Sequence, residues 1–186
     1  MSGAAHVDHS NKNIALLISV LALVLALSET LGKASQTDAL NQNIEAANLW
    51  AFYQAKTIRM TAVRTAQEAA LATLATLPDR ARPALEKQIG DWKKTAARYD
   101  SEPDTQEGRK ELAARAKAAE QRRNHAMAAY HYYELASASV QIAIVLASAS
   151  IITAVAALGW AAGALGAAGI AGCVVGYFWP TAIHLF

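Results

Sequence analysis

The C-terminal 52 residues of the chain contain no Asp, Glu, Lys or Arg. Residues 135–186 read LASASVQIAIVLASASIITAVAALGWAAGALGAAGIAGCVVGYFWPTAIHLF. A water-soluble domain does not leave so long a stretch uncharged, because about a quarter of the residues in ordinary globular proteins are charged and lie on the surface. The stretch therefore predicts helices that lie in a lipid bilayer, and it argues against a simple soluble enzyme.

We expect two transmembrane helices in this stretch, residues 135–158 and residues 160–179, joined by a tight turn at Gly159. Each reaches the length of about 20 residues that a helix needs to cross the hydrocarbon core. Aromatic side chains gather at both surfaces of a bilayer. On this ground the predicted interface aromatics are Tyr130, Tyr132, Tyr133, Trp160, Tyr177 and Trp179.

A further apolar run lies at residues 14–27, and we extend it to a first transmembrane helix at residues 13–32. Glu29 then lies near the interface, where a carboxylate reaches headgroup water at modest cost. The alternative is a cleaved signal peptide, because Ala26-Leu27-Ser28 fits a small-x-small cleavage site. The segment before the run has no net positive charge, which favours a retained helix. The two ends of the chain are then a flexible N-terminal tail, residues 1–12, and a C-terminal tail, residues 180–186.

The charged residues lie almost entirely between the first and second spans. Residues 33–134 hold 16 of the 17 Lys and Arg residues and 13 of the 15 Asp and Glu residues. We expect helices here, the first starting at the capping-box-like Ser35-x-x-Asp38 and ending before Pro78. The predicted fold class is an all-α membrane protein, with three transmembrane helices and a long antiparallel, coiled-coil-like helical hairpin between the first and the second.

Small apolar residues at three-, four- and seven-residue spacing predict which faces of the hairpin pack. Faces made mainly of alanine let backbones approach closely but bury little apolar area, so we expect the hairpin to gain stability by assembling with copies of itself. The alternative is a monomer whose middle helix completes a three-helix bundle. The predicted packing residues are Leu40, Ile44, Ala47, Ala51, Ile58, Ala62, Ala69 and Ala72 on the first helix, and Leu112, Ala116, Ala119, Ala126, Tyr130 and Tyr133 on the last.

Three features of the spans indicate polar or close contacts. Gln141 is strongly polar and lies within the second span, so it is expected to make an interhelical hydrogen bond or to line a pore. Because the insert leaves and re-enters the membrane on one side, Glu29 and Lys33 are expected to face His131 and Glu134. Glycines at three- or four-residue spacing allow close helix packing in the third span: Gly159, Gly163, Gly166, Gly169, Gly172 and Gly176.

No catalytic pattern is visible, and we expect neither an enzyme nor a cofactor. His6-Val7-Asp8-His9 brings two imidazoles and a carboxylate together as metal ligands are, but nothing distant in the sequence completes the set. Cys173 is the single cysteine, so it forms no disulfide within the chain and reads as a packing residue. Basic residues alternate with acidic ones, which argues against nucleic-acid binding. The sequence neither indicates nor excludes a small-molecule ligand.

Two segments resemble a known family. They are residues 48–59, NLWAFYQAKTIR, and the pair YELA at 133–136 and QIAIVLAS at 141–148. Both are similar to the bacterial membrane-protein family catalogued as domain of unknown function 4337, and the resemblance covers most of the chain. It implies a helical protein of the bacterial inner membrane and supplies no catalytic residues. Relatives often carry Arg or Lys in the turn between the last two spans, whereas residues 153–159 have none.

The partners expected from the sequence are the lipid bilayer and further copies of the chain. More basic residues flank the insert than precede the first span, so the positive-inside rule places the insert in the cytoplasm; the basic turn of the relatives argues the reverse. The predicted function is a homo-oligomeric scaffold or interaction protein. The alternative is a small oligomeric channel or transporter, with the second and third spans lining a path near Gln141. The residues counted for orientation are Lys33, Arg115, Lys117, Arg122 and Arg123 against Lys12.

Overall fold

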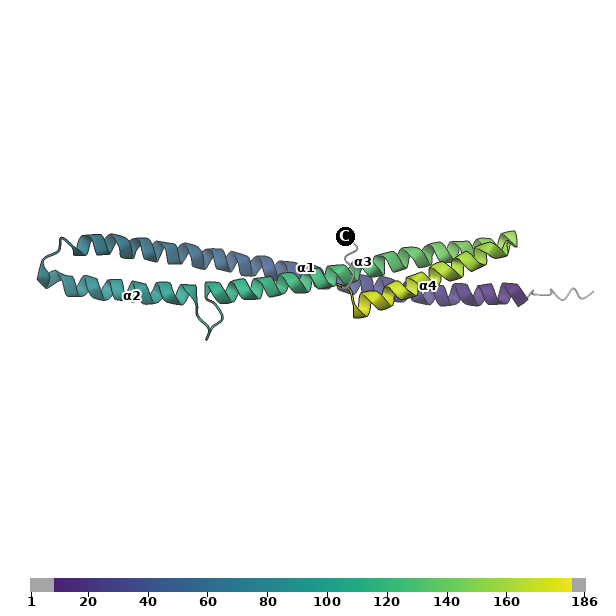
Figure 1. The fold of residues 1–186 in the computed structure, drawn as a ribbon, viewed down its shortest axis with the longest axis horizontal. Helices are drawn as coiled ribbons and strands as arrows, with labels where there is room; N and C mark the ends of the chain where they lie inside the picture. The colour runs from purple at the N-terminus through teal and green to yellow at the C-terminus, as the bar shows by residue number, and fades with distance from the viewer. Residues whose placement is uncertain (1–8, 182–186) are drawn as a thin grey trace, which may run out of the picture. The chain divides into compact units, whose positions relative to one another are not determined.

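The computed structural model describes residues 9–181, and over that range it is helical without strands. Three of its helices, α1, α3 and α4, are long and apolar enough to cross a membrane. Most of the expected N-terminal and C-terminal tails lies outside the described residues. The elements, shown in Figure 1, are α1 (His9–Leu74), the short 3-10 helix η1 (Asp79–Ala81), α2 (Arg82–Asp100), α3 (Arg109–Thr153) and α4 (Ala156–Phe178).

The chain divides into two compact units, to which α1 and α3 each contribute a part. We call residues up to Leu40 together with those from Arg123 the apolar unit, and residues 41–122 the charged unit. The apolar unit holds the first part of α1, the second part of α3 and the whole of α4. The charged unit holds the remaining parts of α1 and α3, with η1 and α2.

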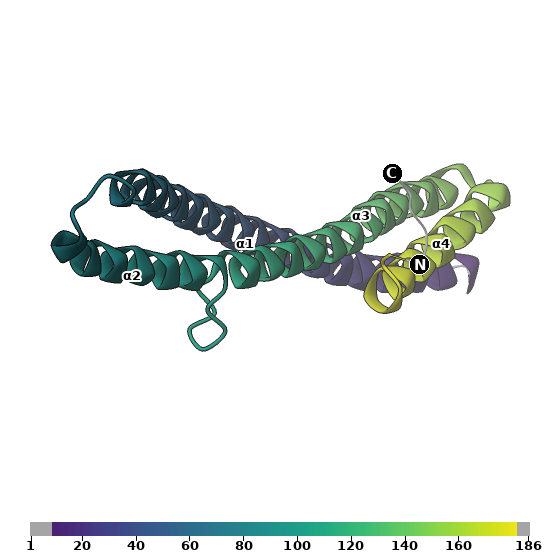
Figure 2. The ribbon, with the colours of Figure 1, turned by 60° about the vertical axis from the view of Figure 1, so that its left-hand side comes forward.

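The apolar unit buries small and branched residues and exposes large apolar ones. In Figures 1 and 2, α4 runs beside the C-terminal part of α3. The side chains of Leu16, Val145 and Ile152 are 66%, 66% and 85% exposed. An apolar exterior of this kind is stable against lipid and costly against water. The core of the unit is formed by Leu21, Val140, Ala143, Ala147 and Ala162.

The turn between α3 and α4 lies at Ala154 and Val155, five residues before the glycine at which the sequence predicted it. Ala154 adopts a left-handed backbone, with φ 56°. Hydroxyl groups bond the turn, because Ser150 Oγ donates to the carbonyl of Val155 at 3.1 Å and Val155 N donates to Thr153 Oγ1 at 3.4 Å. Gly159 lies within α4 instead.

The charged unit packs α1 against α3. Trp50 Nε1 donates to Glu120 Oε1 at 2.8 Å, and Arg122 Nε donates to Gln42 Oε1 at 2.7 Å. These two bonds join residues 42 and 50 of α1 to residues 122 and 120 of α3. The buried residues of the unit's core are Ala46, Leu49, Leu112, Ala116 and Ala119, with Trp50 and Tyr53 packed against them.

The face that α1 buries in the charged unit is not the one predicted. Ile44 and Ile58 are 51% and 69% exposed, whereas Leu49 and Met60 are 7% and 4% exposed. α1 carries apolar residues at helical spacing on two faces, and the buried face also contains Lys56, which made it look solvated in the sequence. The predicted residues that are exposed are Leu40, Ile44, Ala47, Ala51, Ile58, Ala62, Ala69 and Ala72. Of the residues predicted on α3, those buried are Leu112, Ala116, Ala119, Ala126 and Tyr133.

Helix boundaries follow the breakers rather than the expected cap. No helix starts at Ser35, because α1 continues through it for 66 residues. A side-chain cap is needed only where backbone N–H groups lack a carbonyl from a preceding turn, and inside a continuous helix they have one. α1 ends at Leu74, four residues before Pro78, and α3 begins at Arg109 after a loop.

Candidate functional site

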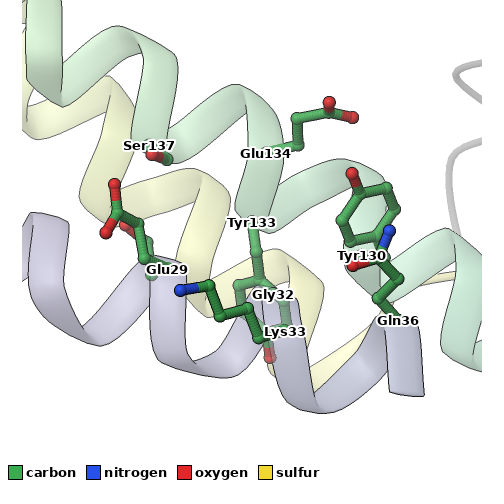
Figure 3. Close-up of a pocket in the computed structure, with 9 residues that line it drawn as sticks. Glu29, Gly32, Lys33, Gln36, Tyr130, Tyr133, Glu134 and Ser137 are labelled. Carbon is green, nitrogen blue, oxygen red and sulfur yellow. The ribbon is translucent and has the colours of Figure 1, made fainter. Parts of the chain in front are cut away.

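An open pocket of about 310 Å³ lies within the apolar unit, between α1 and α3. Figure 3 shows its acidic, basic and phenolic side chains coming from both helices. Four of the lining side chains are exposed, so the pocket is accessible from outside. The lining residues are Ser28, Glu29, Gly32, Lys33 and Gln36 of α1, and Tyr130, Tyr133, Glu134 and Ser137 of α3.

A close approach of the two helices brings these side chains together. A Cβ placed on Gly32 would lie 3.5 Å from Cβ of Tyr133, an ordinary contact distance, so α1 and α3 lie close together here with room for an alanine. The pocket lies where both helices change character: α1 carries no charge from Asn13 to Ser28, and α3 carries none after Glu134. A boundary between uncharged and charged segments is where a membrane helix meets the headgroups.

The polar groups of the pocket are only partly engaged with one another. Glu29 Oε1 accepts from Gln141 Nε2 at 3.5 Å, and the same nitrogen lies 3.2 Å from Ser137 Oγ. His131 Nδ1 lies 3.7 Å from Glu134 Oε2. Among residues 12–181, no ion pair involves Lys33. The pocket thus offers one cation, two carboxylates and hydroxyl donors.

Glu29, Lys33 and Glu134, which the sequence was expected to bring face to face, all line this pocket. His131, expected in the same cluster, does not line the pocket but contacts Glu134. Gln141, expected to bond across helices, is exposed and donates to Glu29 from α3 to α1.

Glycines of α4 lie against α3 and α1 of the same chain. A Cβ on Gly169 would meet Val140 Cγ2 at 2.6 Å and the carbonyl of Ala136 at 3.1 Å. On Gly176 it would meet Cβ of Tyr132 at 2.8 Å. The remaining positions are looser: Gly166 is close to the flexible end of Leu21, Gly172 and Gly159 are in ordinary or slightly tight contact, and Gly163 has nothing within 4 Å.

The predicted interface aromatics divide into two groups. Trp160, Tyr177 and Trp179 are 82%, 66% and 60% exposed. Tyr132 and Tyr133 are buried instead, at 7% and 4%, because they pack where Gly176 leaves room on α4. Tyr130 is half-buried and lines the pocket.

Sequence reasoning missed a polar network centred on Arg109 in the charged unit. The Arg109 guanidinium donates to Thr57 Oγ1 and to the Tyr53 hydroxyl, each at 2.9 Å, and lies 3.4 Å from Asp100 Oδ1. Lys56, 9% exposed, lies 3.6 Å from Glu107. The available signal was the spacing of Tyr53, Lys56 and Thr57, which places three polar side chains on the buried face of α1.

The loop before α3 is held by two carboxylates. Glu111 accepts from Ser101 Oγ at 2.6 Å and from the backbone N–H of Glu102 at 3.1 Å. The hydrogen bond from Ser101 lowers the pKa of Glu111, and the hydrogen bond from Lys110 lowers the pKa of Asp100. Gly108 is required here, because a Cβ would collide with the Glu111 carboxylate and the Glu102 nitrogen. The network thus fixes the start of α3 and is structural.

Residues 10–179 match the family described as Domain of unknown function (DUF4337). The chain belongs to this family. No curated protein and no solved structure matches the chain. Within the described residues, no group of three or more His, Cys, Asp or Glu side chains is placed to hold a metal ion, and the His6-Val7-Asp8-His9 motif lies outside the described side chains. The DUF4337 description names no activity, so the function has to be argued from the geometry of this chain.

Proposed function

We propose that the protein is a homo-oligomeric membrane scaffold. In this proposal α1, α3 and α4 each cross the bilayer, and residues 33–134 form an antiparallel, coiled-coil-like insert outside it. The supporting observation is an uncovered apolar face on α1. We define the outer face of α1 as Ile44, Ala47, Ala51, Ala55, Ile58 and Ala62, all of which are exposed.

The outer face of α1 lies opposite the face that packs within the chain. Leu49, Lys56 and Met60 occupy the buried side of the same helix. Two exposed isoleucines with alanines between them are costly in water, because their apolar area remains hydrated. A partner that covers the outer face recovers this free energy.

The composition of the outer face favours a second copy as the partner. None of its six residues is charged, so a rotation axis between identical chains brings no like charges together. Alanine at Ala47, Ala51 and Ala55 allows two helices to approach closely, while the isoleucines supply the area. The same face on every chain is thus self-complementary.

The membrane part of the proposal rests on the exterior of the apolar unit. Exposed Leu23, Ile142 and Val174 are 62%, 54% and 45% accessible, on three different helices. A surface this apolar on every helix fits hydrocarbon as its solvent. We place the protein in a bacterial inner membrane, with the insert in the cytoplasm by the positive-inside rule.

The test is the molar mass of the purified chain in detergent, by light scattering with the detergent subtracted. We expect an integral multiple of 19.7 kDa for the wild type. The double variant Ile44→Glu/Ile58→Glu brings like charges together and is expected to yield single chains. The control Ala97→Glu/Ala114→Glu changes two other exposed positions of the charged unit and keeps the oligomer. A wild type of 19.7 kDa contradicts the proposal.

A second candidate is a small oligomeric channel or transporter. The observation that favours it is the exposed Gln141, which donates to Glu29 on the outside of the apolar unit. Polar groups that face outward from a membrane helix line a path if copies surround them. Ion flux into liposomes, lost in Gln141→Leu, supports this function, and liposomes without flux contradict it.

A further inference from the structure

The pocket of the apolar unit has the charge pattern of a zwitterionic ligand. Glu29 and Lys33 belong to α1 and Glu134 belongs to α3, and all three line the same cavity of about 310 Å³. Figure 3 shows Glu29 and Lys33 on α1, and Tyr130 and Glu134 on α3, with the carboxylate of Glu134 directed away from α1. A cation and carboxylates presented together fit a ligand that carries both charges.

The groups that surround Lys33 do not neutralise it. No ion pair among residues 12–181 uses its ammonium, while Gln36 and Tyr130 add an amide and a hydroxyl donor to the lining. These three donors match the oxygens of a phosphate diester. Glu29 then matches a primary ammonium, which has three N–H groups to give.

The surroundings of the pocket indicate where such a ligand comes from. Leu27 and Leu135, which adjoin the pocket residues along α1 and α3, are 55% and 47% exposed. Both helices are uncharged on one side of the pocket and charged on the other. Apolar surface on one side and polar groups on the other suit a molecule with acyl chains and a headgroup.

We propose that this pocket binds the phosphoethanolamine headgroup of a membrane phospholipid, with Lys33 on the phosphate and Glu29 on the ammonium. The chemistry of the pocket distinguishes phosphoethanolamine from other headgroups. A glycerol headgroup leaves the lipid anionic and brings no ammonium to the carboxylates. A choline headgroup has no N–H to donate, so it gives the Glu29 carboxylate no hydrogen bond.

The experiment is native mass spectrometry of the full chain in detergent with equal amounts of phosphatidylethanolamine, phosphatidylglycerol and phosphatidylcholine. We expect phosphatidylethanolamine to be retained about tenfold more than either competitor, the factor that a charge-assisted hydrogen bond contributes. Glu29→Gln is expected to abolish the preference, because the carboxylate distinguishes the ammonium from the other headgroups. Lys33→Gln is expected to lower the retention of all three lipids alike, because each of them carries the phosphate. The control Lys12→Gln, at the other end of the first apolar run, leaves the preference unchanged.

Free phosphoethanolamine separates the two sources of this headgroup. We expect it not to displace the lipid at equal concentration, because it lacks the acyl chains that reach Leu27 and Leu135. Displacement by the free headgroup would show that a soluble compound is the ligand and would overturn the lipid assignment. Equal retention of the three lipids, or an unchanged preference in Glu29→Gln, would overturn the site itself. The wild-type ranking needs no variant, so it stands even where a variant fails to fold.

Discussion

The cores of the apolar and charged units are packed in the same way, but the two units expose different side chains. Both cores are built on alanine, Ala143 and Ala147 in one and Ala116 and Ala119 in the other. The apolar unit exposes large apolar side chains on all three of its helices, whereas in the charged unit they are exposed on α1 alone. Close alanine packing therefore does not depend on the solvent around a unit. The side chains on the exterior of the unit indicate which solvent that is. An apolar face on an otherwise polar unit marks a surface for a partner.

The largest expected effect is a loss of stability of the apolar unit, with the stability of the charged unit unchanged. Gly169→Ala places a Cβ 2.6 Å from Val140 Cγ2 and 3.1 Å from a backbone carbonyl, which cannot move cheaply. Overpacking of this kind costs about 3 kcal/mol. Thermal unfolding in detergent, followed by circular dichroism, should show a lower midpoint.

The matched control is Gly163→Ala, where a Cβ meets nothing within 4 Å. Alanine is the better helix former, so this variant should be stabilised by about 0.5–1 kcal/mol. If both glycine variants lose stability equally, close packing of α4 on α3 is not what Gly169 provides.

The second effect breaks the charged unit. Arg109→Ala removes the bonds to Thr57 and Tyr53 and the contact with Asp100, and we expect a loss of about 2 kcal/mol. Hydrogen–deuterium exchange should rise in the loop before α3 and in the facing part of α1, and stay unchanged in α4. The control Arg98→Ala removes an exposed ion pair to Glu102 and should change little.

Lowering the pH should destabilise the charged unit more than the apolar unit, because the carboxylates with lowered pKa lie in the charged unit. The pKa of Asp100 and that of Glu111 are below their ordinary values of 3.8 and 4.5. Their contribution to stability is therefore complete above those values and is lost as the pH falls through the lower pKa of the folded state. Exchange in the loop before α3, compared with the intrinsic rate at each pH, should increase at acid pH.

Glu111→Gln should show a smaller acid effect, because it removes one of the two titrating groups. Glu86→Gln, on the exposed side of α2, serves as its control. An acid response that is identical in Glu111→Gln and the wild type would exclude Glu111 as its source.

The smallest effect concerns the turn between α3 and α4. Ala154 has a left-handed backbone with φ 56°, which costs an alanine about 1 kcal/mol and a glycine nothing. Ala154→Gly should therefore raise the stability of the apolar unit slightly, by about 0.5–1 kcal/mol. A lower unfolding midpoint in this variant would contradict the assigned turn.

The sequence predicted the helices well and the contacts of α1 poorly. On α3 the alanine and leucine stripe is buried, because a single face of that helix is apolar. On α1 the clearest stripe, with Ile44 and Ile58, is exposed, because the other face mixes Leu49 and Met60 with Lys56. Periodicity locates apolar faces, but when a helix has two of them it does not say which one meets the same chain.

The site was predictable in part for a similar reason. Lys33 and Glu134 are expected to lie close because residues 33–134 are predicted to form an insert that leaves and returns at one depth, and not because of any motif; both residues line the pocket. The Arg109 network was missed, because its members, Arg109 included, are spread over three helices and no local pattern joins them. The turn at Ala154 was misplaced, because hydroxyl groups of Ser150 and Thr153 bond it where glycine was expected to do so.

The most direct test of the scaffold is a disulfide between outer faces of α1 in native membranes. In a Cys173→Ala background, Ala51→Cys places one thiol at the centre of the outer face, and mild oxidation should then yield a product of twice the chain mass. Ala97→Cys, exposed on α2, should stay single under the same oxidation. If Ala51→Cys also stays single, copies of the chain do not meet through α1.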